Sequence, residues 1–147
     1  AYFEKELAGG KKISRGRSHI LAYYYRETGR VEDAKKIYES LVKENPHEFT
    51  FYFRYARALK DLKENEKALE WLEKSAPYMT EGNSRMQYSW LKGQILNELN
   101  RKAEALQIVD GTLKIAKAPT WEKDSANKWI RDLTELKKEI EKPAKGK

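Results

Sequence analysis

Residues 18–46 read SHILAYYYRETGRVEDAKKIYESLVKENP, and they contain the clearest structural signal in the chain. Its apolar residues recur three or four positions apart, which is the spacing of one face of a helix. Gly29 lies between two such runs, and glycine suits the left-handed position that ends a helix. Pro46 follows Asn45 and stops the second run. The stretch therefore predicts two helices joined by a short turn.

The same pattern recurs twice further along the chain. Moving Leu21-Ala22-x-x-Tyr25 by 34 residues gives Tyr55-Ala56-x-x-Leu59, and moving on by 37 residues gives Gly93-x-x-Leu96. The three added residues fit in the loop from Ala76 to Ser84. Small residues, which let paired helices approach closely, recur at positions 22, 34, 56, 68, 93 and 105. Large residues beside them recur at positions 25, 38, 59, 72, 96 and 109.

These residues resemble the tetratricopeptide repeat, a 34-residue helix-turn-helix with small, large and proline positions at fixed offsets. Three positions depart from the pattern: Ser18 replaces the usual Trp, the second copy lacks the final Pro, and Lys92 stands where Leu is expected. The resemblance covers residues 15–117. It implies an all-α fold, an α-α superhelix of about three helix pairs.

The rest of the chain is assigned around these repeats. Helices are expected near residues 15–28, 31–45, 48–62, 65–76, 84–99, 101–117 and 120–142. Segment 118–142 is expected to form an amphipathic capping helix, because repeat stacks need a terminal element with one polar side. Thr120 is its expected N-cap, and its apolar face is expected to hold Trp121, Trp129, Ile130, Leu133, Leu136 and Ile140. Segment 1–14 stays unassigned, with a helix left from a preceding element as one alternative, and segment 143–147 is expected to be a flexible tail.

Composition gives little support to catalysis. The chain has no cysteine, which excludes thiolate chemistry and cysteine metal ligands. Its two histidines, His19 and His47, lie on different expected helices, and no glycine-rich phosphate loop is present. We therefore expect no enzymatic activity, no cofactor, no metal site and no small-molecule substrate. No apolar run approaches the length of a membrane span.

The resemblance implies a ligand site on the first helix of each pair. In this family those helices line a concave groove, so the site is expected to bind a protein or peptide. Aromatic and basic residues at the groove positions suit an extended peptide that carries large side chains and acidic groups. The expected groove residues are His19, Tyr23, Arg26, Phe53, Arg54, Arg57, Lys60, Gln87, Trp90, Gln94 and Asn97.

Three other functions stay open. The chain is alternatively an accessory helical domain of a larger protein or enzyme. The net charge of +7 also allows nucleic-acid binding through a basic surface, although 30 basic residues are interleaved with 23 acidic ones. Self-association is a third possibility. One subclass of the family binds chaperone carboxylates through Lys and Asn where His19 and Tyr23 stand here, so that function is not carried over. The sequence leaves the choice between cytoplasm and periplasm open.

Overall fold

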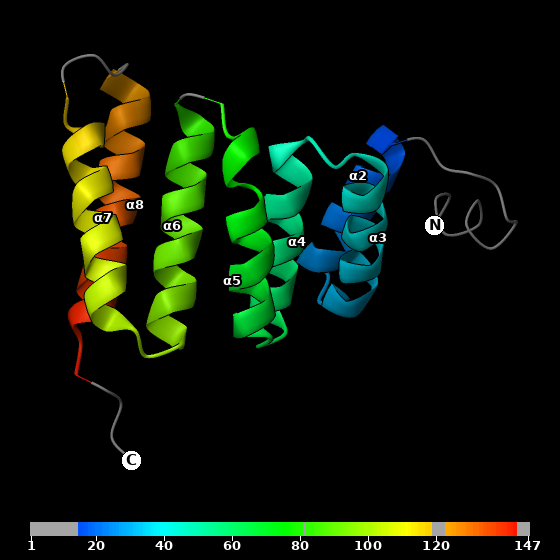
Figure 1. Cartoon of the computed structure of the whole chain (residues 1–147), viewed down its shortest axis with the longest axis horizontal. Helices are drawn as coiled ribbons and strands as arrows, with labels where there is room; N and C mark the ends of the chain where they lie inside the picture. The colour runs from blue at the N-terminus through cyan, green and yellow to red at the C-terminus, as the bar shows by residue number, and fades with distance from the viewer. Residues whose placement is uncertain (1–14, 81, 119–122, 144–147) are drawn as a thin grey trace, which may run out of the picture. The chain divides into compact units, whose positions relative to one another are not determined.

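The structure is a computed structural model that describes residues 15–80, 82–118 and 123–143. The regular elements of this part of the chain are all helical (Figure 1). They are α2 (Arg15–Glu27), α3 (Val31–Glu44), α4 (Phe49–Asp61), α5 (Asn65–Lys74), the short 3-10 helix η1 (Ala76–Tyr78), α6 (Asn83–Glu98), α7 (Lys102–Ala116) and α8 (Lys123–Glu141). The prediction of an all-α fold of three helix pairs and a further helix is therefore confirmed.

The turn inside each helix pair has the same backbone geometry. Gly29, Lys63 and Asn100 all adopt a left-handed conformation, with φ values of 84°, 65° and 63°. The next residue then donates its N–H to a carbonyl five residues earlier: Arg30 to Tyr25 at 2.7 Å, Glu64 to Leu59 at 2.9 Å and Arg101 to Leu96 at 2.8 Å. This closure satisfies a carbonyl that the helix end leaves open. The left-handed positions are spaced as the sequence shifts are, so they fix the register of the third repeat.

The chain divides into two compact units, Ala1–Tyr78 and Met79–Lys147. In the first unit, α3 packs against both α2 and α4, and α4 packs against α5. Small residues at the four expected positions are fully buried, which allows these close helix contacts. They are Ala22, Ala34, Ala56 and Ala68, each 0% exposed.

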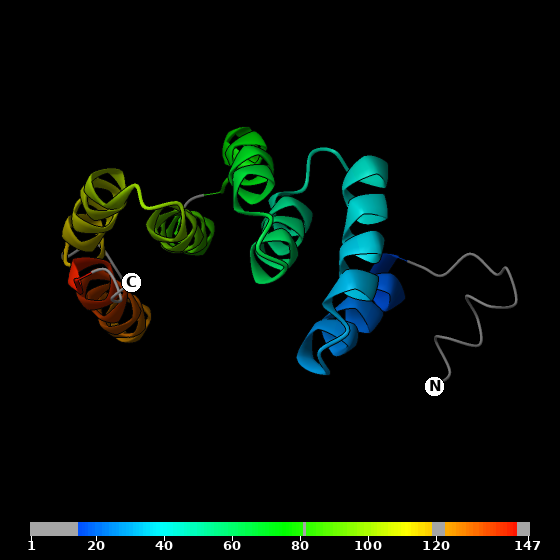
Figure 2. The same ribbon diagram turned by 90° about the horizontal axis from the view of Figure 1, so that it is seen from below.

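In the second unit, α8 packs against both α7 and α6. Figures 1 and 2 show α8, coloured orange to red, beside α7 in both views. A Cβ on Gly93 of α6 would lie 2.9 Å from Val109 Cγ2 and 3.1 Å from Leu136 Cδ2, so only glycine fits this crossing without a shift. Leu133 and Ile140 are fully buried, and each such side chain contributes about 1.5–3 kcal/mol through burial.

The apolar face predicted for the last helix is largely confirmed. Trp129, Leu133, Leu136 and Ile140 are all buried, whereas Ile130 is half-buried. The indole Nε1 of Trp129 also donates to Asn83 Oδ1 at 2.6 Å, which ties α8 to the start of α6. Thr120, Trp121 and segment 1–14 lie outside the described residues. None of the described helices combines the length and the apolar character that crossing a membrane requires.

Candidate binding face

The first unit presents a polar face from α2 and α4. We call it the α2–α4 face, and it consists of His19, Tyr23 and Arg26 on α2 with Arg54, Arg57 and Lys60 on α4. Within each helix these residues follow one another at intervals of three or four, so they share one side. Five of the six are half-buried, whereas Tyr23 is 50% exposed. The face therefore combines partly dehydrated cations with one open aromatic ring.

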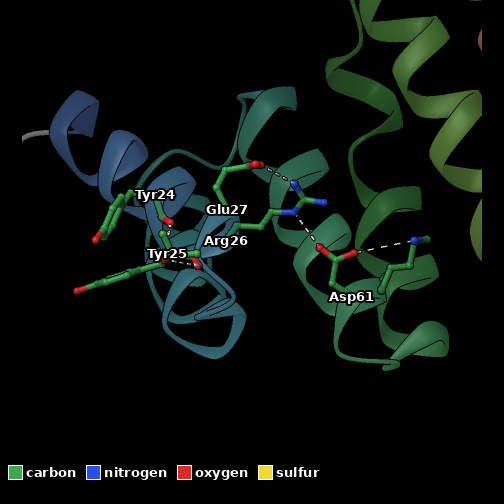
Figure 3. A network of polar contacts seen from close by, with 7 residues as sticks. Tyr24, Tyr25, Arg26, Glu27 and Asp61 are labelled. Carbon is green, nitrogen blue, oxygen red and sulfur yellow. Dashed lines mark hydrogen bonds and ion pairs between the residues drawn. The ribbon is translucent and has the colours of Figure 1, made fainter.

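An ion-pair network joins the two helices at the end of this face (Figure 3). Arg26 Nε donates to Asp61 Oδ2 at 2.8 Å, and Arg26 Nη1 donates to Glu27 Oε1 at 3.2 Å. Lys60 Nζ lies 3.9 Å from the other oxygen of Asp61. Two carboxylates thus balance part of the positive charge and fix Arg26 in place. Arg54 and Arg57 extend the face beyond this network.

Three buried polar atoms near the arginines lack a hydrogen-bond partner among the described residues: His19 Nδ1, Tyr38 Oη and Arg54 Nε. The His19 ring centroid lies 5.9 Å from that of Tyr38 and 5.8 Å from that of Phe51, so aromatic rings wall the imidazole. Tyr38 comes from α3 and is 0% exposed. A buried donor that stays unpaired costs about 1–3 kcal/mol. These atoms therefore form a buried polar cluster at the α2–α4 face.

The electrostatics of the face follow from burial and from crowding of like charges. Burial lowers the pKa of His19, and the nearby charge of Arg54 lowers it further. Burial also lowers the pKa of Arg57, and Arg26 and Arg54 act in the same direction. Burial raises the pKa of Tyr38, against the opposing effect of the three arginines. Tyr38 therefore keeps its proton and can donate a hydrogen bond at neutral pH.

One expected groove residue of α4 lies elsewhere. Phe53 is only 3% exposed, so the prediction that it presents its ring on the surface is wrong. Its ring stacks on Phe49 at a centroid distance of 5.9 Å. The guanidinium carbon of Arg54 lies 5.8 Å from the centroid of the Phe53 ring. Phe53 is thus a core residue whose ring lies near the guanidinium group of Arg54.

The expected residues of the third pair lie in the second unit, and all four are half-buried on α6: Gln87, Trp90, Gln94 and Asn97. Trp90 and Gln94 line a pocket with residues of α8. Three of those α8 residues are acidic, namely Asp132, Glu135 and Glu139. The surroundings of Trp90 are therefore opposite in charge to the α2–α4 face.

Sequence reasoning missed the buried polar cluster around Tyr38 and the carboxylates of α8. Tyr38 matched a packing position of the repeat, and nothing in its spacing showed that its hydroxyl would lack a partner. The acidic residues of α8 stood on the polar side of an amphipathic helix, where solvent exposure is the ordinary expectation. Their i, i+3 and i+7 spacing was a usable signal, because it places them on one side of the helix. No group of three or more His, Cys, Asp or Glu suited to a metal occurs among the described residues.

Comparison with known proteins identifies the repeat. Residues 21–85 match the family model of the tetratricopeptide repeat. No curated protein matches the chain.

Solved structures with the same fold cover most of the chain. PcrH in complex with the chaperone binding region of PopD is 13% identical, with a TM-score of 0.70, over 85% of this chain and 89% of PcrH. The Yersinia enterocolitica type III secretion translocator chaperone SycD is 18% identical, with a TM-score of 0.67, over 87% of this chain and 95% of SycD. The TPR2B domain of yeast Sti1, in a complex with pHsp70, is 16% identical, with a TM-score of 0.63, over 82% of this chain and 96% of the Sti1 domain.

Proposed function

Because residues 21–85 form a tetratricopeptide repeat segment, we propose that the chain is a protein-interaction module that binds an acidic peptide segment on the α2–α4 face. The binding is non-covalent, with no turnover and no cofactor. A carboxylate of the ligand lies against Arg54 and Arg57, and an apolar side chain of the ligand contacts the open ring of Tyr23. The repeat segment supports the general class of function, and the chemistry of the face supports the choice of ligand.

The observation that carries this proposal is the crowding of half-buried arginines on one face. Arg26, Arg54 and Arg57 are all half-buried, and burial together with the charges of Arg26 and Arg54 lowers the pKa of Arg57. A carboxylate accepts several hydrogen bonds at once, and it offsets the repulsion among neighbouring arginines. An apolar or cationic ligand would leave this repulsion in place. The half-buried state of the arginines strengthens their attraction for an anion, because water screens them less.

Structural neighbours supply independent support for peptide binding as a class. PcrH is in complex with a region of PopD, and the second TPR domain of human RPAP3 is in complex with an HSP70 peptide. The identities are low, so these proteins lend support to the fold and to no particular partner. Nucleic-acid binding, self-association and a role as an accessory domain of an enzyme remain predictions.

A peptide library tests the proposal directly. Beads that carry random octapeptides with free C-termini are sorted against the fluorescently labelled chain, and the selected peptides are sequenced. We expect Asp, Glu or a required free C-terminal carboxylate among the selected peptides. Binding of one selected peptide is then measured by fluorescence anisotropy. Selection of peptides with no anionic requirement would refute the proposal.

Two variants locate the binding on the α2–α4 face. Arg54→Gln removes the charge at the centre of the face, and we expect roughly tenfold weaker binding, since a hydrogen bond to a charged group contributes about 1.5–3 kcal/mol. Arg85→Gln removes an exposed arginine at the start of α6 and serves as the matched control. Equal effects of the two changes would mean that net charge, and not the face, governs binding.

A further inference from the structure

The second unit contains a pocket whose chemistry differs from that of the α2–α4 face. It has a volume of about 330 Å³ and lies between α6 and α8. It is lined by Trp90, Gln94, Asp132, Glu135, Leu136 and Glu139. We call it the α6–α8 pocket. The pocket therefore combines the apolar side chains of Trp90 and Leu136 with three carboxylates. This combination suits a ligand that has both an apolar part and a positive charge.

The walls of the pocket are positioned by the core of the unit. Leu136 is 7% exposed, and its Cδ2 lies 3.1 Å from the position that a Cβ on Gly93 would occupy. Trp90 and Gln94 flank this crossing on α6, one turn apart. Because α8 approaches α6 closely at Gly93, the turns of α8 around Leu136 place Asp132, Glu135 and Glu139 at the same pocket. The pocket is thus part of the packed structure and does not depend on a loop.

Two of the α8 carboxylates pair with exposed basic side chains. Asp132 Oδ1 lies 3.6 Å from Arg131 Nε, and Glu139 Oε2 lies 3.0 Å from Lys142 Nζ. Both basic side chains are well exposed, at 68% and 65%, so solvent screens these pairs and the bases can move away at little cost. Glu135 is exposed as well. The pocket therefore stays attractive to a cation.

We infer that the α6–α8 pocket takes a lysine or arginine side chain of a partner protein or peptide. The aliphatic stem of such a side chain packs against Trp90 and Leu136, as long charged side chains do on apolar surfaces. Its charged end meets the carboxylates, and an indole ring adds cation–π attraction when a cation lies over it. This inference does not rest on the proposed function of the α2–α4 face, and it assigns ligand groups of opposite charge to the two units.

Binding is tested with N-acetylated pentalysine amide at low ionic strength, because the charge of this probe is known. Fluorescein-labelled pentalysine is titrated in an anisotropy assay, and the indole N–H resonances are followed by NMR. We expect saturable binding in which the Trp90 indole signal moves most. The signal of Trp129, whose indole is bonded to Asn83, serves as an internal reference. Pentalysine acetylated on every side chain is expected to cause no shift. Absence of saturable binding would overturn the inference.

Paired charge removals separate the pocket from general attraction to acidic surface. Glu135→Gln with Glu139→Gln is expected to weaken pentalysine binding at least fivefold. The matched control is Glu66→Gln with Glu70→Gln, an exposed pair on α5 with the same spacing, which should leave binding within twofold. Equal weakening by both pairs would overturn the inference. All four glutamates are exposed, and a thermal melt of each variant verifies that it folds.

The role of the ring is tested by two changes at Trp90. Trp90→Phe keeps an aromatic face, and Trp90→Leu keeps apolar volume without one. We expect the phenylalanine variant to bind pentalysine within threefold of the original chain and the leucine variant to bind at least fivefold more weakly. If leucine binds as well as phenylalanine, the ring has no part in recognition and the inference fails in this respect.

Discussion

Arg26 of α2 and Asp61 of α4 form an ion pair at 2.8 Å, which joins two helices through residues 35 positions apart. The pair also lowers the positive charge that the α2–α4 face offers to a ligand. We expect Asp61→Asn to strengthen binding of a selected acidic peptide several-fold and to cost about 1 kcal/mol of folding free energy. Anisotropy and urea unfolding measure the two effects. Weaker binding in this variant would show that Asp61 serves the ligand and not only the helices.

Tyr38→Phe should raise the stability of the chain and leave its affinity for an acidic peptide unchanged. The change removes a buried hydroxyl that has no hydrogen-bond partner among the described residues and keeps the ring. We expect the free energy of unfolding to rise by up to about 1 kcal/mol, because an unpaired buried donor is destabilising. We also expect acidic-peptide binding to stay within twofold, because this side chain has no exposed surface. A loss of stability would contradict the first expectation, and weaker binding would mean that the ligand opens the core to reach this hydroxyl.

His19 makes the stability of the first unit depend on pH. Burial and Arg54 lower its pKa in the folded chain, so the unfolded chain takes up a proton first as the pH falls. The free energy of unfolding therefore decreases from about pH 6.5 downward until the folded chain also protonates. The slope stays below about 1.4 kcal/mol per pH unit, the limit for one proton. Urea unfolding between pH 7.5 and 5 measures it, with His19→Gln expected to flatten the profile.

The repeated turn predicts opposite signs for two substitutions. Gly29 has a φ of 84°, and a Cβ there would meet no atom within 4 Å, so Gly29→Ala introduces backbone strain alone. We expect a loss of about 1 kcal/mol. Lys63 adopts the same conformation with a φ of 65°, and Lys63→Gly is expected to gain about 0.5 kcal/mol. Thermal melts rank the three chains. A loss at Lys63 would indicate that its side chain outweighs the strain.

Close packing at Gly93 is open to a double-mutant test. Gly93→Ala places a Cβ 2.9 Å from Val109 Cγ2, and overpacking of this kind costs about 1–3 kcal/mol. Val109→Ala leaves a small cavity that also destabilises the unit. The double variant should lose less than the sum of the two losses, because the new methyl group enters the space that valine leaves. Strict additivity would mean that the two positions are not in contact.

The sequence predicts the helices well because their signals are local and repeated. Left-handed closure at Gly29 was expected, and Lys63 and Asn100 repeat it. The surface of α4 was harder to predict, because five aromatic side chains along this helix are buried, namely Phe49, Phe51, Tyr52, Phe53 and Tyr55. A helix buried on several sides has no clear exposed stripe. For this reason the sequence pattern wrongly predicts that Phe53 lies on the exposed side of α4.

The candidate site was only partly predictable, for a different reason. Periodicity gives the side of a helix on which a residue lies, and it places Arg54 and Arg57 on the α2–α4 face. It does not give the partner of a polar atom, which depends on neighbouring helices. The unpaired hydroxyl of Tyr38 and the carboxylates beside Trp90 both arise from such neighbours. Both features depend on how α3 and α8 pack, which the sequence pattern does not specify.

The packing of α8 against both α6 and α7 has a consequence for synthesis of the chain. Helices of the first unit pack on their immediate neighbours in sequence, so each can settle soon after it emerges from the ribosome. The crossing at Gly93 must instead wait for Leu136, more than 40 residues later. Until then α6 exposes the apolar side that α8 will cover. The second unit is therefore the part of the nascent chain that stays vulnerable to aggregation longest.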